Sequence, residues 1–159
     1  MQSTILFPFD GSAASLEAVR HLAQGSIVAG RKVLLVNVQS AYIDAELSQA
    51  GRWVADMYRS EGLAILRPAI EVLREAGIAY QAEVVFGAPA PTILRLARER
   101  GCELIVMGTR ALHPLAEVFT RSVPSRVLRE SHVPVMLVPR AGESWHPVTP
   151  EQRAPWIAA

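Results

Sequence analysis

The stretch that decides the fold is residues 104–110, which read Leu-Ile-Val-Met-Gly-Thr-Arg. It is followed by Arg121 and Ser122, then by a segment with helical spacing, and then by a second apolar run, Val133–Pro139. A buried strand that leads through a glycine into a helix N-terminus is how open α/β sheets form a phosphate pocket. The stretch therefore predicts such a pocket, although Ala111 and Arg121 stand where glycines would suit a phosphate.

The composition of the chain favours a single globular domain. It has 159 residues, of which 50% are hydrophobic and 19% are charged, so a real core is expected. The net charge is +1, and the arginines are scattered rather than blocked; Lys32 is the only lysine. Nucleic-acid binding proteins carry a concentrated basic patch, so no nucleic-acid partner is predicted.

Cysteine, histidine and hydropathy patterns bear on metal sites and location. The single cysteine, Cys102, rules out an internal disulfide and is expected to be a small buried hydrophobe. The four histidines are dispersed, with no spacing typical of metal ligands, so no metal site is predicted. The N-terminus has no leader pattern, and no apolar stretch approaches the roughly 18 residues of a membrane span. We therefore expect a cytoplasmic protein without membrane contact.

Hydrophobic periodicity predicts strands that alternate with helices. The first helix starts at Ser12, carries Leu16, Val19, Ala23 and Ile27, and ends at Gly30. Pro68 is expected to kink the second helix or to mark its true start. The expected strands are residues 5–9, 32–38, 80–86, 104–107 and 135–138, and the later helices are about 60–76, about 92–100 and 122–130. Residues 40–59 are interpreted as a loop with a helical turn or two, and residues 140–159 as an irregular tail after a domain at 1–139.

Five strands that alternate with helices indicate an open parallel sheet with right-handed crossovers and helices on both faces. In such sheets, ligands bind beyond the carboxyl ends of the strands, where the winding direction reverses. Residues that follow the strands are therefore the candidates for a binding site.

Three polar positions follow the strands, and each has a structural and a functional interpretation. Asp10 either bonds the backbone to start a helix or binds a ligand such as an adenine, a ribose or a metal. Gly108 would allow close approach by a ligand, and Arg110 would either pair with a phosphate or lie in solvent. Ser122 either caps its helix or also helps to hold an anion.

Other α/β chemistries fail on their residues. A phospho-acceptor receiver domain would need a second acidic residue beside Asp10, and none is present. The Gly-Lys-Ser/Thr sequence of a phosphate-binding loop is absent as well. Gly87-Ala-Pro is no dinucleotide fingerprint, Cys102 lacks the arginine of a cysteine phosphatase, and no nucleophile elbow occurs. No catalytic residues are predicted, and the chain is interpreted as a binding protein rather than an enzyme.

Taken together, four segments resemble the universal stress protein family over almost the full length to Pro139. They are Ile5–Ser12, Phe86–Ala90, Glu103–Gly108 with Arg110, and Val127-Leu128 leading to Val133–Pro139. The resemblance implies a Rossmann-like fold of the adenine nucleotide alpha hydrolase type, with strand order 3-2-1-4-5. It also implies a homodimer through the fifth strand, Val133–Pro139, and the apolar character of that edge strand gives the pairing a physical motive.

Members of this family that bind ATP carry Gly-x-x-Gly, nine residues, and then Gly-Ser/Thr. Here the first glycine is Gly108 and the final residue is Ser122, but Ala111 and Arg121 replace the other two glycines. By residue matching, Asp10 and Val38 fall where the family contacts adenine and ribose. Side chains at 111 and 121 would crowd the approach of phosphate, although the charge of Arg121 would attract it.

Three hypotheses follow for the function of the chain. The leading one is a dimeric stress-response binding or interaction module without strong ATP binding, which meets an unidentified protein partner. The alternative is an ATP-binding switch with Mg²⁺ and slow hydrolysis that uses Asp10, Gly108, Arg110, Arg121 and Ser122. A third is a small-molecule carrier whose ligand is lined by Phe9, Val38 and Met107.

Overall fold

The computed structural model describes residues 3–40, 49–109 and 122–140. Five parallel strands form one sheet in the order β3-β2-β1-β4-β5, as the sequence predicts. The strands are β1 (Thr4–Pro8), β2 (Lys32–Gln39), β3 (Tyr80–Phe86), β4 (Leu104–Thr109) and β5 (Val135–Pro139). The helices are α1 (Ala13–Gln24), α2 (Gln49–Glu75), α3 (Pro89–Glu99) and α5 (Val123–Glu130), with a short 3₁₀ turn at Ser26–Val28.

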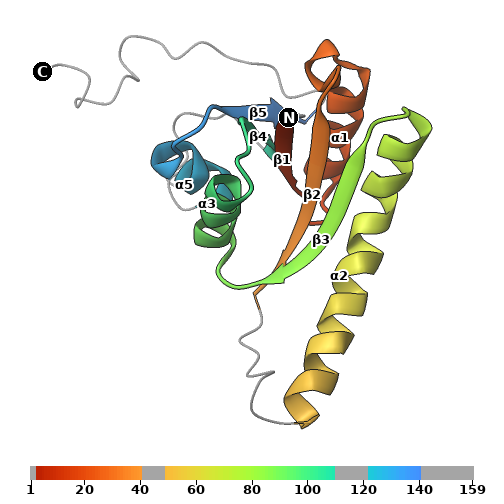
Figure 1. The fold of residues 1–159 in the computed structure, drawn as a ribbon, viewed down its shortest axis with the longest axis vertical. Coiled ribbons are helices and arrows are strands. Elements are labelled where there is room, and N and C mark those ends of the chain that lie inside the picture. The colour runs from red at the N-terminus through yellow and green to blue at the C-terminus, as the bar shows by residue number, and fades with distance from the viewer. Residues whose placement is uncertain (1–2, 41–48, 110–121, 141–159) are drawn as a thin grey trace, which may run out of the picture.

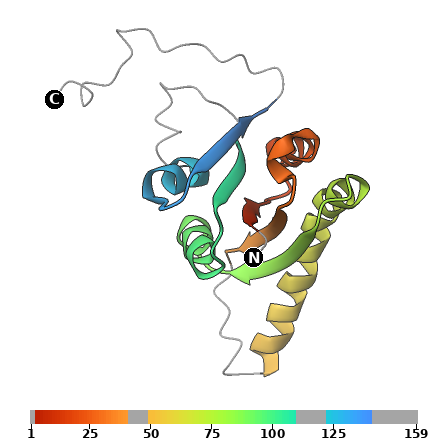
Figure 2. The ribbon, with the colours of Figure 1, turned by 45° about the horizontal axis from the view of Figure 1, so that its top comes forward.

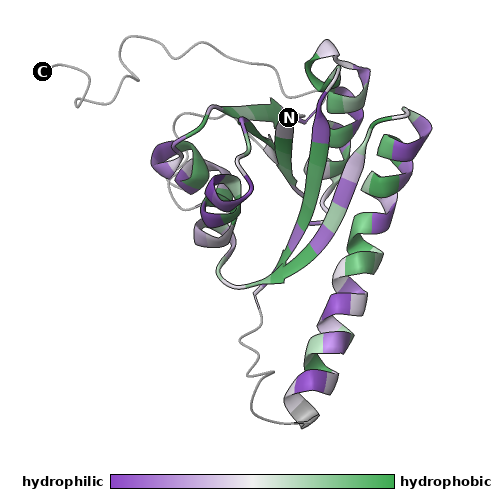
Figure 3. Ribbon diagram, in the orientation of Figure 1, coloured by the Kyte–Doolittle hydropathy of each residue, from purple (hydrophilic) through white to green (hydrophobic). Residues whose placement is uncertain are grey.

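Helices cover the sheet from both faces, with α1 and α2 on one and α3 and α5 on the other (Figures 1 and 2). Side chains of each central strand point alternately to the two sides. In β1, for example, Ile5 and Phe7 are buried under α1 and α2, while Leu6 is buried under α3. Two apolar cores therefore sandwich the sheet, which explains why β1, β2 and β4 are apolar nearly throughout. Figure 3 shows the same division, with apolar strands inside and polar residues on the outer sides of the helices.

Helix α2 corrects the interpretation of residues 40–59. The helix begins at Gln49, not near residue 60, and it continues through Pro68 without starting or stopping there. Its first turns extend past the sheet (Figure 1), so they carry no apolar stripe, and the side chain of Trp53 is 69% exposed. The fully buried residues Leu66, Ala69 and Leu73 lie in the later turns, although Ala55 is also buried. Because large apolar side chains of the earlier turns, such as Trp53 and Met57, are exposed, no regular hydrophobic period marks the start of this helix.

Helix α1 is shorter than its sequence pattern suggests. It ends at Gln24, where the N–H of Gly25 bonds the carbonyl of Leu22, and the 3₁₀ turn follows. Its buried side consists of Ala14, Ser15, Ala18, Val19 and Leu22, while Leu16 and Ile27 of the predicted stripe are partly buried against the same core. Small residues dominate this side because the helix packs close to the sheet.

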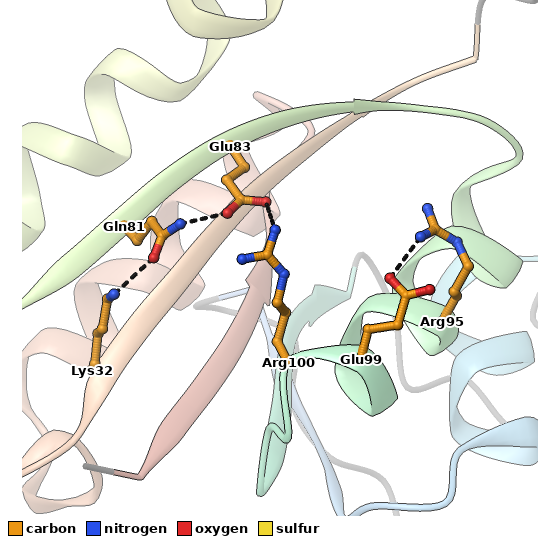
Figure 4. Close-up of polar contacts among 6 residues, drawn as sticks. All are labelled: Lys32, Gln81, Glu83, Arg95, Glu99 and Arg100. Carbon is orange, nitrogen blue, oxygen red and sulfur yellow. Dashed lines mark hydrogen bonds and ion pairs between the residues drawn. The ribbon is translucent and has the colours of Figure 1, made fainter. Parts of the chain in front are cut away.

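The two edge strands differ in polarity. Gln81 and Glu83 of β3 link Lys32 to Arg100 in a chain of hydrogen bonds (Figure 4), with successive distances of 2.7, 2.5 and 2.9 Å. β5, at the other edge of the sheet, carries no polar side chain, and its residues Val135, Met136 and Leu137 are only partly buried. Charged side chains protect an edge strand from pairing with another chain, whereas an apolar edge favours such pairing.

Further findings on the described residues concern the cysteine, membrane spans and metal-ligating side chains. Cys102 is buried, and burial raises the pKa of its thiol, as expected for a small hydrophobe. In the described ranges, no helix is long and apolar enough to cross a membrane. No group of three or more metal-ligating side chains is found there either. The tail prediction falls on residues 141–159, which lie outside the described ranges.

Candidate functional site

A cavity of about 320 Å³ opens at the carboxyl ends of the three central strands β1, β2 and β4. This is the position that the strand order predicts, since β1 and β4 flank the point where the winding reverses. Its floor is apolar and includes Val36, Ile93 and Met107. The other lining residues are Pro8, Phe9, Asp10, Ser15, Asn37, Val38, Ser40, Pro89, Gly108, Val123 and Pro124.

Asp10 lies at the rim of the cavity and also organises the start of α1. Its Oδ1 accepts hydrogen bonds from the backbone N–H of Ser12 at 2.9 Å and from the hydroxyl of Ser15 at 2.7 Å. Partial burial raises the pKa of Asp10, but the hydrogen bonds from Ser12 and Ser15 outweigh it, so the pKa lies below its ordinary value. The turn-forming interpretation of Asp10 is confirmed, and the carboxylate stays charged near neutral pH.

Serines cap the helices on both sides of the cavity in the same way. At α1, the N–H of Ser15 donates to Oγ of Ser12 at 3.2 Å. At α5, the N–H of Ser125 donates to Oγ of Ser122 at 3.3 Å, which confirms the capping role of Ser122. In both helices the second serine returns a bond to the carbonyl of the first, at 2.9 and 2.8 Å. Each capped N-terminus presents the positive end of a helix dipole.

Gly108 is part of β4 rather than of the loop after it, and its missing side chain has a clear cause. A Cβ at this position would lie 2.4 Å from the carbonyl oxygen of Ala14 and 2.8 Å from Cα of Ser15. Helix α1 therefore crosses β4 so closely that only glycine fits. The close approach expected at Gly108 is made by the chain's own helix, and the residue lines the cavity as well.

Asn37 is a site residue that the sequence reasoning missed. Its side chain is buried, its Nδ2 donates to the carbonyl oxygen of Phe9 at 2.9 Å, and its Oδ1 accepts from Gln39 at 2.7 Å. These bonds fix the backbone of residue 9 just before Asp10. The signal was present, because Asn37 is the one polar residue in the apolar run 33–38.

The cavity brings together only part of the predicted site. Asp10, Val38 and Gly108 line it, as do Phe9 and Met107, the residues named for a small-molecule carrier. Ser122 stands next to the lining residues Val123 and Pro124 at the start of α5. Arg110, Ala111 and Arg121 lie outside the described ranges. Pro89 and Ile93 of α3 also line the cavity, although neither was predicted as a site residue.

Comparisons with known proteins agree with this geometry. The model of the universal stress protein family matches residues 1–139. A universal stress protein from Methanocaldococcus jannaschii is 30% identical over 136 residues, which cover 84% of this chain and 80% of the relative. Universal stress protein YxiE from Bacillus subtilis is 32% identical over 157 residues, which cover 87% and 99%. Among solved structures, a universal stress protein in complex with cAMP has a TM-score of 0.64 and 26% identity, covering 88% of this chain and 98% of the other.

Proposed function

The chain belongs to the universal stress protein family, and from that premise we propose that its cavity binds the adenosine part of an adenine nucleotide carrying a single phosphate. Binding of such a ligand would report the nucleotide state of the cell to a protein partner, without turnover. The observation that carries the proposal is the cavity at the carboxyl ends of β1, β2 and β4, with its apolar floor and the Asp10 carboxylate at its rim.

The size and lining of the cavity suit a nucleoside. Small-ligand pockets measure about 300–1,000 Å³ and combine apolar walls with a few polar groups. At about 320 Å³ this cavity is near the lower limit, so it suits a nucleoside better than a whole triphosphate. A base would lie on Val36, Ile93 and Met107, and the ionised carboxylate of Asp10 would accept a hydrogen bond from a ribose hydroxyl.

The phosphate is expected to contribute less than in relatives that carry the full glycine motif. Asp10 already supplies a negative charge at the start of α1, so an anionic group would be favoured at the start of α5 instead. Ala111 and Arg121 replace two glycines of the ATP-binding pattern. At the start of α5 a phosphate can bond the N–H of Val123, because Pro124 has no N–H and the N–H of Ser125 already bonds Oγ of Ser122. One phosphate suits that single group, whereas a long triphosphate chain needs the close backbone approach that glycine gives. The solved relative bound to cAMP, a nucleotide with one phosphate, supports this choice.

Calorimetric titration tests the proposal with adenosine, AMP, cAMP and ATP with Mg²⁺, and with GMP as the control for the base. We expect AMP and cAMP to bind, and ATP to bind no more than about threefold more tightly than AMP. At a hundredfold its Kd, a ligand adds about 2.7 kcal/mol of stability, which raises the melting temperature by roughly 5–10 °C. Absence of binding by every adenine compound would refute the proposal.

A double variant tests separately how the phosphate chain of the ligand contributes to binding. Replacing Ala111 and Arg121 together by glycine restores the family pattern, so ATP affinity should rise about tenfold while AMP affinity changes little. Tight ATP binding by the unaltered chain would instead favour the ATP-dependent switch.

We also propose that the chain forms a homodimer through β5. β5 ends the strand order, so among the described residues its outer edge has no partner strand. Its side chains Val135, Met136 and Leu137 are only partly buried, and a second copy of β5 would cover them and pair the backbone.

Light scattering with size-exclusion chromatography tests the dimer and should give twice the chain mass. Met136→Lys should shift the protein to monomer while circular dichroism stays native. The matched control, Leu63→Lys on the exposed side of α2, should remain dimeric, and a monomeric unaltered chain would contradict the dimer.

A further inference from the structure

We propose that Met107 is an oxidation site through which peroxides control the occupancy of the cavity, so that nucleotide binding and methionine oxidation exclude each other. This inference rests on the proposed nucleotide function and adds the regulation of the same site.

The position of Met107 distinguishes it from the other described methionines. It lies in β4 and is 5% exposed, yet it lines the cavity beside Phe9 and Gly108. Met57, in contrast, is 46% exposed on α2, and Met136 packs against the other core. Met107 therefore combines an apolar setting with contact to an open cavity, where a molecule nearly as small as water can reach it.

The chemistry needs no group other than a peroxide. The thioether sulfur attacks one peroxide oxygen, the O–O bond breaks, and that oxygen stays on sulfur as a sulfoxide. Sulfur is oxidised by two electrons, and the peroxide is reduced to water, or to an alcohol if it is an alkyl peroxide. The product carries a polar S–O group where the thioether had none.

The surroundings make that change costly for a ligand. Met107 packs in the cluster that contains Leu6, Val36 and Ile93, all of them apolar. A base that covers the sulfoxide would bury its polar S–O group against these apolar side chains, and the added oxygen also takes up part of a small cavity. We expect oxidation to weaken AMP binding about tenfold, the size typical of one buried unpaired polar group.

The coupling must hold in both directions. If sulfoxide formation weakens nucleotide binding, bound nucleotide must disfavour sulfoxide formation by the same factor at equilibrium. A base on the cavity floor also shields the thioether from peroxide. Oxidants and nucleotides would thus compete for one site on a stress protein.

The experiment treats the full chain with hydrogen peroxide and follows each methionine by peptide mass spectrometry, with Met57 as the internal reference. AMP and cAMP affinities are measured before treatment, after treatment, and after a methionine sulfoxide reductase. We expect Met107 to oxidise, the Kd to rise about tenfold, and the reductase to reverse the change. Saturating AMP should slow oxidation of Met107 at least fivefold and leave Met57 unaffected.

Two variants distinguish the effect of Met107 oxidation on the Kd from that of oxidation elsewhere in the chain. In Met57→Leu the tenfold loss should persist. In Met107→Leu the ratio of the Kd after peroxide to the Kd before it should fall to one, whatever the starting affinity. Circular dichroism checks that each oxidised protein stays folded. The inference is overturned if Met107 stays reduced while Met57 is fully oxidised, or if its oxidation leaves the Kd unchanged. Absence of AMP and cAMP binding before treatment instead refutes the proposed function, and the inference with it.

Discussion

Helices α1 and α5 begin on opposite sides of the cavity, and their first turns are built alike. Each has a serine cap and a second serine three residues on, with the same pair of hydrogen bonds. They differ in what stands before the cap. Asp10 stands two residues before the α1 cap, and its carboxylate accepts the N–H of Ser12. In the sequence, Thr120 and Arg121 precede the α5 cap, so no carboxylate stands at the matching position.

The difference shows how one local design can serve two purposes. At α1, a side chain of the protein already satisfies the positive end of the helix dipole, and Gly108 lets the helix lie directly against β4. At α5, two cavity-lining residues, Val123 and Pro124, form the first turn itself. We interpret the α1 start as a structural anchor and the α5 start as the side that meets a ligand's anionic group.

The largest expected effect comes from breaking the anchor. Gly108→Ala puts a Cβ 2.4 Å from the backbone of α1, which cannot yield as a flexible side chain would. We expect a loss of about 3 kcal/mol in the free energy of unfolding, measured by urea denaturation without ligand. The matched control is Gly25→Ala, where the nearest atoms are 3.6 Å away and φ is negative. Equal stability of the two variants would mean that α1 is not held by this contact.

Removing the caps should have an intermediate effect and separates the two helix starts. Ser12→Ala and Ser122→Ala should each cost about 1 kcal/mol of stability, because each leaves a helix N-terminus without its cap. In calorimetry, Ser122→Ala should also weaken AMP more than adenosine, whereas Ser12→Ala should weaken both ligands equally. If the two variants gave the same ratio of AMP to adenosine affinity, the assignment of separate roles would fail.

The smallest effect concerns the charge of Asp10. Its pKa in the folded chain lies below the unfolded value, so its ionisation stabilises the fold above about pH 4. That contribution disappears as the pH falls through the folded-state pKa. Asp10→Asn keeps hydrogen-bond acceptors but removes the charge, so it should cost about 0.5 kcal/mol at pH 7.

The pH dependence provides the check on this last prediction. Thermal melts at pH 7, 5 and 3 should show a difference between the unaltered chain and Asp10→Asn that is constant down to about pH 5 and then shrinks. Asp56→Asn, an exposed change on α2, is the control for general effects of acid. A difference that grew towards acid would reverse the sign assigned to Asp10.

The sequence predicted the sheet well because the central strands are buried on both faces and therefore apolar nearly throughout. It pointed to Asp10 and Gly108 because residues at the ends of parallel strands gather at one edge, and to Val38 through the family resemblance; all three line the cavity. The sequence-based prediction failed where the role of a residue depends on a packing partner that is distant in the chain. The first turns of α2 lack a sheet to pack against and so lack a hydrophobic period. The role of Gly108 depends on a helix almost a hundred residues earlier in the chain, which no local pattern reveals.

Lys32 begins β2, at the amino end of the sheet, and its amino group bonds Gln81 on the neighbouring strand. It carries the only lysine amine in the chain. An amine-reactive fluorophore would therefore label this one side chain besides the N-terminus, at the opposite end of the strand from the cavity. The protein thus provides its own attachment point for a dye or a surface tether that leaves the ligand entrance open.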